Sequence, residues 1–186
     1  PTLTTVTGEC GVSVTPPTTT DNCSGLITGT TTSPLIYDRE GRYTITWTFT
    51  DASNNVTTAT QLVIIDDVTP PVVPVLADVV GECSVQVTRP TTTDLCAGTI
   101  TGTTTGSLTF NQQGTYTITW KFSDGNGNTS TATQRVIVDD ITAPVPPALP
   151  DIYAECSVTV QRPKATDNCN GFITGTTTSP LVYNTD

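Results

Sequence analysis

The chain repeats itself with a period of 73 residues. Its six cysteines form two series with that spacing: Cys10, Cys83 and Cys156, then Cys23, Cys96 and Cys169. Roughly six positions in ten match between residues 8–80 and residues 81–153. The sequence therefore predicts a tandem array of one small unit, present in about two and a half copies.

Each repeat carries the alternating pattern of β-strands. Tyr43, Ile45, Trp47 and Phe49 take every second position with threonines between them, and residues 116–123 repeat this pattern. Strands that bury one face show this period of two, so Trp47 and Trp120 are predicted to point into a core. Helix-forming residues are scarce, and turn signals separate six or seven short strands per repeat. The sequence predicts an all-β fold of tandem antiparallel β-sandwich repeats.

Proline-rich segments mark the joints between repeats, at residues 69–74 and 142–150. We therefore expect a first repeat over residues 1–67, a complete second repeat over 68–140 and a partial third over 141–186. Because proline fixes φ and favours extended backbone, the joints should be stiff and the repeats joined end to end as a rod. The chain contains no Met and starts in a joint, so we expect it to be part of a longer polypeptide.

The cysteines predict disulfides. The two cysteines of a repeat always have twelve residues between them, which favours one disulfide within each repeat and an oxidising compartment. The predicted pairs are Cys10–Cys23, Cys83–Cys96 and Cys156–Cys169. Free buried thiols are the alternative; a zinc site is disfavoured because the chain has no His.

Composition argues against several functions. Without His, a Ser or Cys nucleophile lacks its usual base, and no phosphate-binding or dinucleotide motif is present, so we expect no enzyme. The net charge is −10 and the 7 basic residues form no cluster, so nucleic acid is not expected as a partner. No apolar run is long enough for membrane insertion.

The order of motifs resembles a known family. Gly8-Glu9-Cys10, Asp21-Asn22-Cys23, an aromatic strand ending in Asp51 and Ile65-Asp66-Asp67 follow one another in the order of the hyalin-type repeat. The chain is also similar to tandem repeats of giant surface adhesins of gliding Bacteroidota. This resemblance implies an immunoglobulin-like sandwich in an extracellular stalk or filament. The hyalin pattern often has further cysteines, which this chain lacks.

The acidic residues keep the register of the repeat, whereas the basic residues do not. Fourteen of the 17 acidic residues recur at the 73-residue spacing, but of the basic residues only Arg89 and Arg162 do. The basic residues serve as an internal control for recent duplication, so the register of the carboxylates indicates a role. Ca²⁺, which takes six to eight oxygen ligands, is the predicted ligand.

The implied topology brings the end of one repeat to the last hairpin turn of the next. The predicted Ca²⁺ ligands at these joints are Asp66, Asp67, Asp124, Asn126, Asn128 and Glu9, with Asp139 and Asp140 at the second joint. Asp94 is left open, because a Cys83–Cys96 pair would make its position ambiguous. The alternative is that these residues are ordinary turn formers and solubilising charges.

These observations predict the structural stalk of a repetitive extracellular adhesin or surface filament. Its expected partners are neighbouring repeats of the same chain, with surface polysaccharide or other cells as possible ligands. The alternatives are a polysaccharide-binding repeat, for which the threonine tracts at residues 18–20 and 30–32 are candidates, and the non-catalytic spacer of a secreted enzyme.

Overall fold

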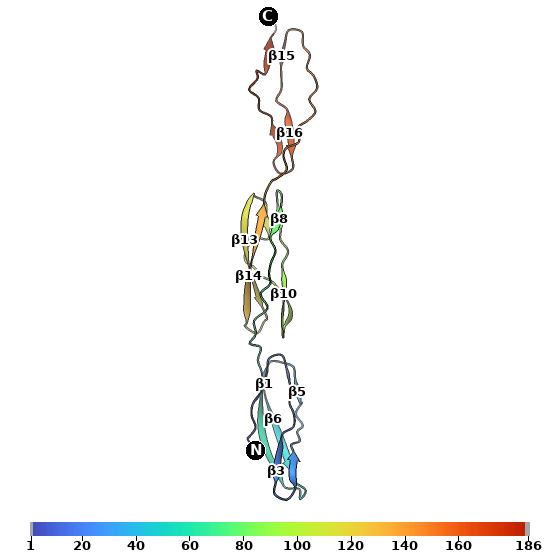
Figure 1. The fold of residues 1–186 in the computed structure, drawn as a ribbon, viewed down its shortest axis with the longest axis vertical. Helices are drawn as coiled ribbons and strands as arrows, with labels where there is room; N and C mark the ends of the chain where they lie inside the picture. Colours follow the sequence, from blue (N-terminus) through green and yellow to red (C-terminus); the bar gives the residue numbers. More distant parts are fainter. Residues whose placement is uncertain (1, 185–186) are drawn as a thin grey trace. The chain divides into compact units, whose positions relative to one another are not determined.

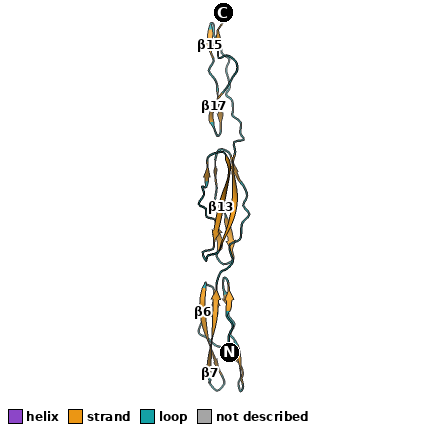
Figure 2. Cartoon of the chain, turned by 90° about the vertical axis from the view of Figure 1, so that its left-hand side faces the viewer, coloured by secondary structure: helices purple, strands orange, loops and turns teal. Residues whose placement is uncertain are grey.

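The computed structural model describes residues 2–184, which form β-strands and contain no helix (Figures 1 and 2). The all-β prediction is confirmed. Contacts group the chain into two compact units, and each unit combines parts of successive repeats. The first unit holds Pro1–Val75, Arg89–Thr103 and Trp120–Ala132; the second holds Leu76–Thr88, Thr104–Thr119 and Thr133–Asp186. Each predicted joint between repeats therefore lies inside one compact unit.

The first repeat contains seven strands. They are β1 (Val6–Gly8), β2 (Val12–Ser13), β3 (Thr18–Asp21), β4 (Gly25–Thr28), β5 (Ile36–Tyr37), β6 (Gly41–Thr50) and β7 (Val56–Ile65). The hairpin β6–β7 is extended by β1 into a three-stranded sheet, while β2 pairs with β5 and β3 with β4. β1 runs parallel to β7, with Val6 opposite Val63, whereas β6 pairs with β7 in the antiparallel direction. β1 and β7 can pair in parallel because the chain between them is long enough to serve as the crossover connection.

The second repeat has the same seven elements. They are β8 (Val79–Gly81), β9 (Val85–Gln86), β10 (Thr91–Asp94), β11 (Gly98–Thr101), β12 (Thr109–Phe110), β13 (Gly114–Ser123) and β14 (Thr129–Val138). Their sheets are β13-β14-β8, β10-β11 and β12-β9, and β8 is again parallel to β14. The repetition of the sequence is thus a repetition of strand order.

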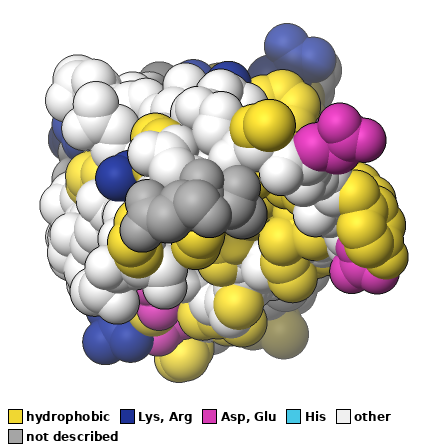
Figure 3. Space-filling view, turned by 90° about the horizontal axis from the view of Figure 1, so that it is seen from above, with side chains coloured by type: hydrophobic (Ala, Val, Ile, Leu, Met, Phe, Trp, Pro, Cys, Tyr) yellow, Lys and Arg dark blue, Asp and Glu magenta, His cyan; other side chains and the backbone are white. Residues whose placement is uncertain are grey.

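The third repeat contributes four short strands. They are β15 (Ser157–Thr159), β16 (Lys164–Asp167), β17 (Gly171–Thr174) and β18 (Val182–Asn184), paired as β15-β18 and β16-β17. Several of its apolar side chains are exposed, among them Ile152, Tyr153, Phe172 and Tyr183. The end-on view in Figure 3 shows hydrophobic side chains gathered at the surface there. The 186-residue sequence has no counterpart of β13 or β14 that would cover this repeat.

The long hairpin of the first repeat carries its core. Ile45, Trp47 and Phe49 alternate with more exposed residues along β6, and Trp47 is 0% exposed. Ala59 faces Trp47 across the hairpin, where a small side chain leaves room for the indole. The indole N–H donates to Gln61 Oε1 at 2.9 Å, so the buried donor is satisfied. Trp120 is also 0% exposed, which confirms the predicted burial of both tryptophans.

The predicted disulfide pairing within each repeat is wrong. The structure joins Cys10 to Cys96 and Cys83 to Cys169, so each disulfide links the first cysteine of one repeat to the second cysteine of the next. Each lies inside one compact unit. Closing loops with a sequence separation of 86 contributes about 4–5 kcal/mol each in the chain-entropy model.

The length of strand β7 explains why Cys10 does not pair with Cys23. Cys10 follows β1, whose Gly8 lies opposite Ile65, the last residue of β7. Cys23 lies in the β3–β4 turn next to Ser24, whose hydroxyl accepts a hydrogen bond from Ala52 N in the turn before β7. A ten-residue strand spans about 30 Å, whereas a disulfide needs Cα atoms within about 7 Å. Cys23 and Cys156 are exposed and lie outside the two disulfides.

Candidate metal site at the repeat boundary

Three acidic residues from two successive repeats lie in the first compact unit. Asp67 follows the end of β7, Asp94 ends β10, and Asp124 follows the end of β13. Carboxylate oxygens of Asp67 and Asp94 and the Sγ atom of Cys96 all lie within 4.8 Å of one another. Asp67 and Asp94 are only 5% and 7% exposed. The fold therefore concentrates two buried carboxylates next to the Cys10–Cys96 disulfide.

The β13–β14 loop reaches Asp67 through its asparagines. Asn126 Nδ2 donates to Asp67 Oδ2 at 3.2 Å, and Asn128 Nδ2 donates to the Asp67 carbonyl oxygen at 2.8 Å. Glycines 125 and 127 adopt φ values of 95° and 113°, which let this short loop turn back on itself. The loop of the second repeat is thus held against the end of the first.

Two carboxylate oxygens at this boundary are buried without a hydrogen-bond partner among the described residues. Asp94 Oδ1 accepts from the backbone N–H groups of Cys96 and Ala97, both at 2.9 Å, but Asp94 Oδ2 has no partner. Asp124 Oδ1 accepts backbone N–H groups of its own loop, and its Oδ2 is also orphaned. A buried carboxylate oxygen without a partner raises the free energy of the folded state, so a positively charged partner at either atom would stabilise the fold.

The same loop in the first repeat provides an internal comparison. There Asn55 Nδ2 donates to Asp51 Oδ2 at 2.7 Å, so the carboxylate that corresponds to Asp124 is satisfied. In the second repeat the equivalent Asn128 also donates to the Asp67 carbonyl oxygen at 2.8 Å. The loop of the second repeat therefore differs from that of the first in contacting the preceding repeat.

The two loop carboxylates have lowered pKa values. The side-chain hydrogen bond from Asn55, together with backbone N–H groups, lowers the pKa of Asp51. Partial burial raises the pKa of Asp124, but hydrogen bonds from Asn128, Asn126 and Gly127 outweigh burial and lower its pKa below the ordinary value. Both groups are thus anions at neutral pH, as a cation site requires.

A second cluster of the same kind lies in the second compact unit. Its ligand atoms come from Asp140, Asp167 and Cys169, which occupy the positions of Asp67, Asp94 and Cys96 one period later. Asn170 Nδ2 donates to Asp140 Oδ2 at 3.1 Å, while Asp140 Oδ1 is buried without a partner among the described residues. The three ligand positions recur with the sequence repeat, while the buried oxygen without a partner among the described residues belongs to Asp94 in the first cluster and to Asp140 in the second.

Other predicted ligands lie elsewhere. Asp66 and Asp139 are exposed, because successive residues of extended backbone point to opposite sides and only one of each Asp-Asp pair faces the cluster. Glu9 accepts hydrogen bonds from Thr69 Oγ1 at 3.0 and 2.9 Å. Its counterpart Glu82 accepts from Thr142 in the same way. The glutamates therefore hold the chain just after the Asp-Asp pair.

The sequence prediction omitted Asp94 and Asp167 from the ligands. Both residues recur in register and stand two positions before a cysteine, which was the available signal. The assumption that Cys83 pairs with Cys96 obscured the position of Asp94. Once Cys96 is bonded to Cys10, Asp94 must lie at the boundary between the repeats.

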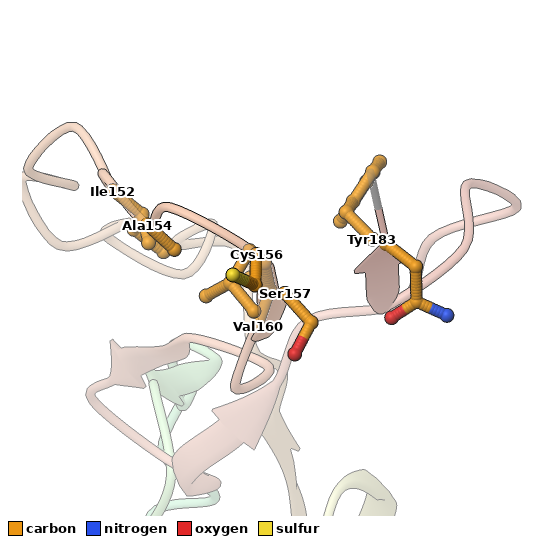
Figure 4. A pocket seen from close by; sticks show the side chains of 8 residues that line it. Ile152, Ala154, Cys156, Ser157, Val160 and Tyr183 are labelled. Atoms are coloured by element: carbon orange, nitrogen blue, oxygen red, sulfur yellow. The ribbon is translucent and has the colours of Figure 1, made fainter. Parts of the chain in front are cut away.

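A pocket in the third repeat is lined by no charged side chain among the described residues. Its lining includes Ile152, Ala154, Cys156, Val160 and Tyr183 (Figure 4). Val160 corresponds to Val87 of the second repeat, which is 4% exposed in the core. The pocket is therefore the core face of a repeat for which the sequence has no counterpart of β13.

The fold and the boundary cluster define a class: tandem β-sandwich repeats that are disulfide-linked to their neighbours. No protein family model matches the chain. The chain is similar to hyalin from Strongylocentrotus purpuratus, with 38% identity over 154 residues. The match covers 74% of this chain and 13% of hyalin, so the chain spans a small part of that relative's length. This similarity supports a hyalin-like repeat.

The two disulfides fit an oxidising, extracellular environment. Among residues 2–184 there is no helix that could span a membrane.

Proposed function

We propose that this chain is part of the non-catalytic stalk of an extracellular adhesin or surface filament, in which Ca²⁺ joins successive repeats. The 73-residue repetition, the two disulfides and the similarity to hyalin support an extracellular array. The motif resemblance to giant adhesins of gliding Bacteroidota suggests the setting, a cell surface on which length and stiffness matter. The absence of His from the sequence agrees with a structural role.

The main support for the calcium proposal is Asp94 Oδ2, which is buried and accepts no hydrogen bond from the described residues. A carboxylate oxygen of Asp94 lies within 4.8 Å of one of Asp67. Two close carboxylates repel each other unless a cation or a proton intervenes. A cation bound here would contact Asp67 of one repeat and Asp94 of the next.

The surrounding donors fit a hard cation. Asp67 and Asp94 provide carboxylate oxygens, which Ca²⁺ prefers. The buried Oδ2 of Asp124, which has no partner among the described residues, lies in the loop whose Asn126 contacts Asp67. Asn126 and Asn128 point their amides at Asp67, and rotating an amide by half a turn would offer its oxygen instead. The Cys96 sulfur belongs to a disulfide, so it is no thiolate ligand and the donor set is oxygen.

Isothermal titration calorimetry with CaCl₂ tests this proposal. The variant Asp140→Asn/Asp167→Asn isolates the site in the first unit. In that background Asp94→Asn should weaken binding by about tenfold or more, because the central buried charge is lost. The matched control Asp66→Asn removes an exposed carboxylate next to Asp67 and should leave the affinity unchanged. No calcium heat in the parent chain, or equal losses from Asp94→Asn and Asp66→Asn, would reject the site.

Cell-surface labelling tests the extracellular role. An antibody raised against the chain should label intact cells that produce it, and protease added outside the cells should remove the signal. Labelling only after permeabilisation would contradict the proposed location.

A further inference from the structure

The two disulfides interlace along the chain. Cys10 bonds to Cys96 and Cys83 bonds to Cys169, so the second closed loop begins before the first one ends. Residues 83–96 belong to both loops. We propose that this interlacing gives the array a further function: it is a tether that bears tension while remaining nearly inextensible.

The shortest covalent route through the chain shows why. From Cys10 the route crosses the first disulfide to Cys96, follows the backbone back to Cys83 and crosses the second disulfide to Cys169. It contains 13 backbone steps and two disulfides with Cα–Cα distances of 4.9 Å. Fully extended at about 3.6 Å per residue, this route is roughly 60 Å long. The backbone route between Cys10 and Cys169 would reach roughly 570 Å.

Tension follows the shorter route, so most of each sandwich is protected from it. The core strands β6 and β7 lie between Cys10 and Cys83, and β13 and β14 lie between Cys96 and Cys169. These strands, which contain Trp47 and Trp120, are outside the taut segment. If a sandwich unfolded under force, its strands would therefore release no length. Only β9 and β10, between Cys83 and Cys96, lie on the route.

Pairing within each repeat would not have this effect. A Cys10–Cys23 bond would close a small loop and leave the core strands on the route of the force. The same number of cysteines per repeat therefore yields a tether or an ordinary extensible array, according to the pairing alone. The inference depends only on covalent connectivity and is independent of the metal site, so it survives if no cation binds.

Single-molecule stretching of the whole chain, tethered at its two ends, tests the proposal. The parent for this experiment is Cys23→Ser/Cys156→Ser, which keeps only the four bonded cysteines. Its fully stretched contour length should be about 150 Å when oxidised and about 670 Å with a phosphine reductant. An oxidised length of about 500 Å or more would overturn the proposal, because it would mean pairing without interlacing.

Two matched variants show the interlacing itself. Removing either disulfide, by Cys10→Ser/Cys96→Ser or by Cys83→Ser/Cys169→Ser in the same background, should give an oxidised length of about 360 Å. The loss of the first disulfide then adds less length than the loss of the second, because residues 83–96 are shared. An oxidised length of about 670 Å for either variant would show that its two substituted cysteines belong to different disulfides, and would refute the tether.

Discussion

At the scale of single residues, the buried indole of Trp47 anchors the core of the first repeat. It is 0% exposed, and its N–H is bonded to Gln61, which in turn donates to the Thr4 carbonyl at 3.0 Å. The apolar ring and its one polar atom are both satisfied, so the hairpin β6–β7 and the N-terminal segment are held to the same side chain. Truncation of this residue should therefore affect the whole repeat.

We expect Trp47→Ala to destabilise the first repeat by about 3–5 kcal/mol, through lost burial and the cavity left behind. Thermal unfolding followed by circular dichroism measures the change. The control is Thr46→Ala, an exposed neighbour in the same strand, which should change stability by less than about 0.5 kcal/mol. Similar melting of both variants would show that the indole is not the anchor.

The lowered pKa of Asp51 predicts how its loop responds to acid. Its pKa in the folded state lies below the ordinary value of 3.8, so its contribution to stability is fully present above that pH. The contribution is lost as the pH falls through the lowered pKa. The difference in melting temperature between the parent and Asp51→Asn should therefore shrink below pH 3.8. The control is Asp38→Asn, which changes another exposed carboxylate. If its melting-temperature difference from the parent shrinks with acid in the same way, the Asp51 loop is not the cause.

At the scale of elements, the turns between strands determine to which repeat each cysteine is bonded. The β10–β11 turn carries Cys96 and Asp94 together, since Asp94 Oδ1 accepts the Cys96 N–H. The disulfide to Cys10 therefore positions the orphaned carboxylate oxygen as well as linking the repeats. At each boundary, the disulfide and the candidate metal site therefore share the same short turn.

Peptide mapping without reduction should recover the fragment of Cys10 linked to that of Cys96, and the fragment of Cys83 linked to that of Cys169. An alkylating reagent should label the exposed Cys23 in the unreduced chain. The reduced chain, in which every cysteine is alkylated, is the control for recovery. A Cys10–Cys23 fragment would contradict the pairing.

At the scale of the whole molecule, each boundary between repeats lies inside a compact unit and carries both a disulfide and an acidic cluster. The sandwiches have their own cores, so the boundary contacts do not need to hold the repeats folded. Their effect should be on the freedom of one repeat relative to the next. The end-to-end rod stays a prediction that solution scattering can test.

Removal of Ca²⁺ by a chelator should broaden the distance distribution in small-angle X-ray scattering, because the carboxylates at the boundary would repel one another. Far-UV circular dichroism should stay unchanged, since the core and the disulfides remain. Asp94→Asn, which lowers that repulsion, should respond less to the chelator. Identical scattering profiles with calcium and with chelator would count against a cation that stiffens the array.

Much of the fold could be predicted from the sequence, because it depends on local periodicity. The alternation around Trp47 and Trp120 predicted two-sided strands and the buried indoles, and the turn residues predicted where strands end. The register of the acidic residues indicated a role for the Asp-Asp pairs and the Asp124–Asn128 loop. These features lie within a few residues of one another, where backbone geometry leaves few alternatives.

The disulfide partners and the place of Asp94 were decided only by the tertiary structure. In a sequence with a period of 73, a cysteine 13 residues away and one 86 residues away differ by one period and occupy equivalent positions. Spacing therefore cannot distinguish pairing within a repeat from pairing between neighbours. A disulfide forms between the thiols that are close in space, and the length of β7 places Cys10 beside the next repeat. Asp94 follows Cys96 to the same boundary, so the sequence specified the parts and the three-dimensional path of the chain selected their partners.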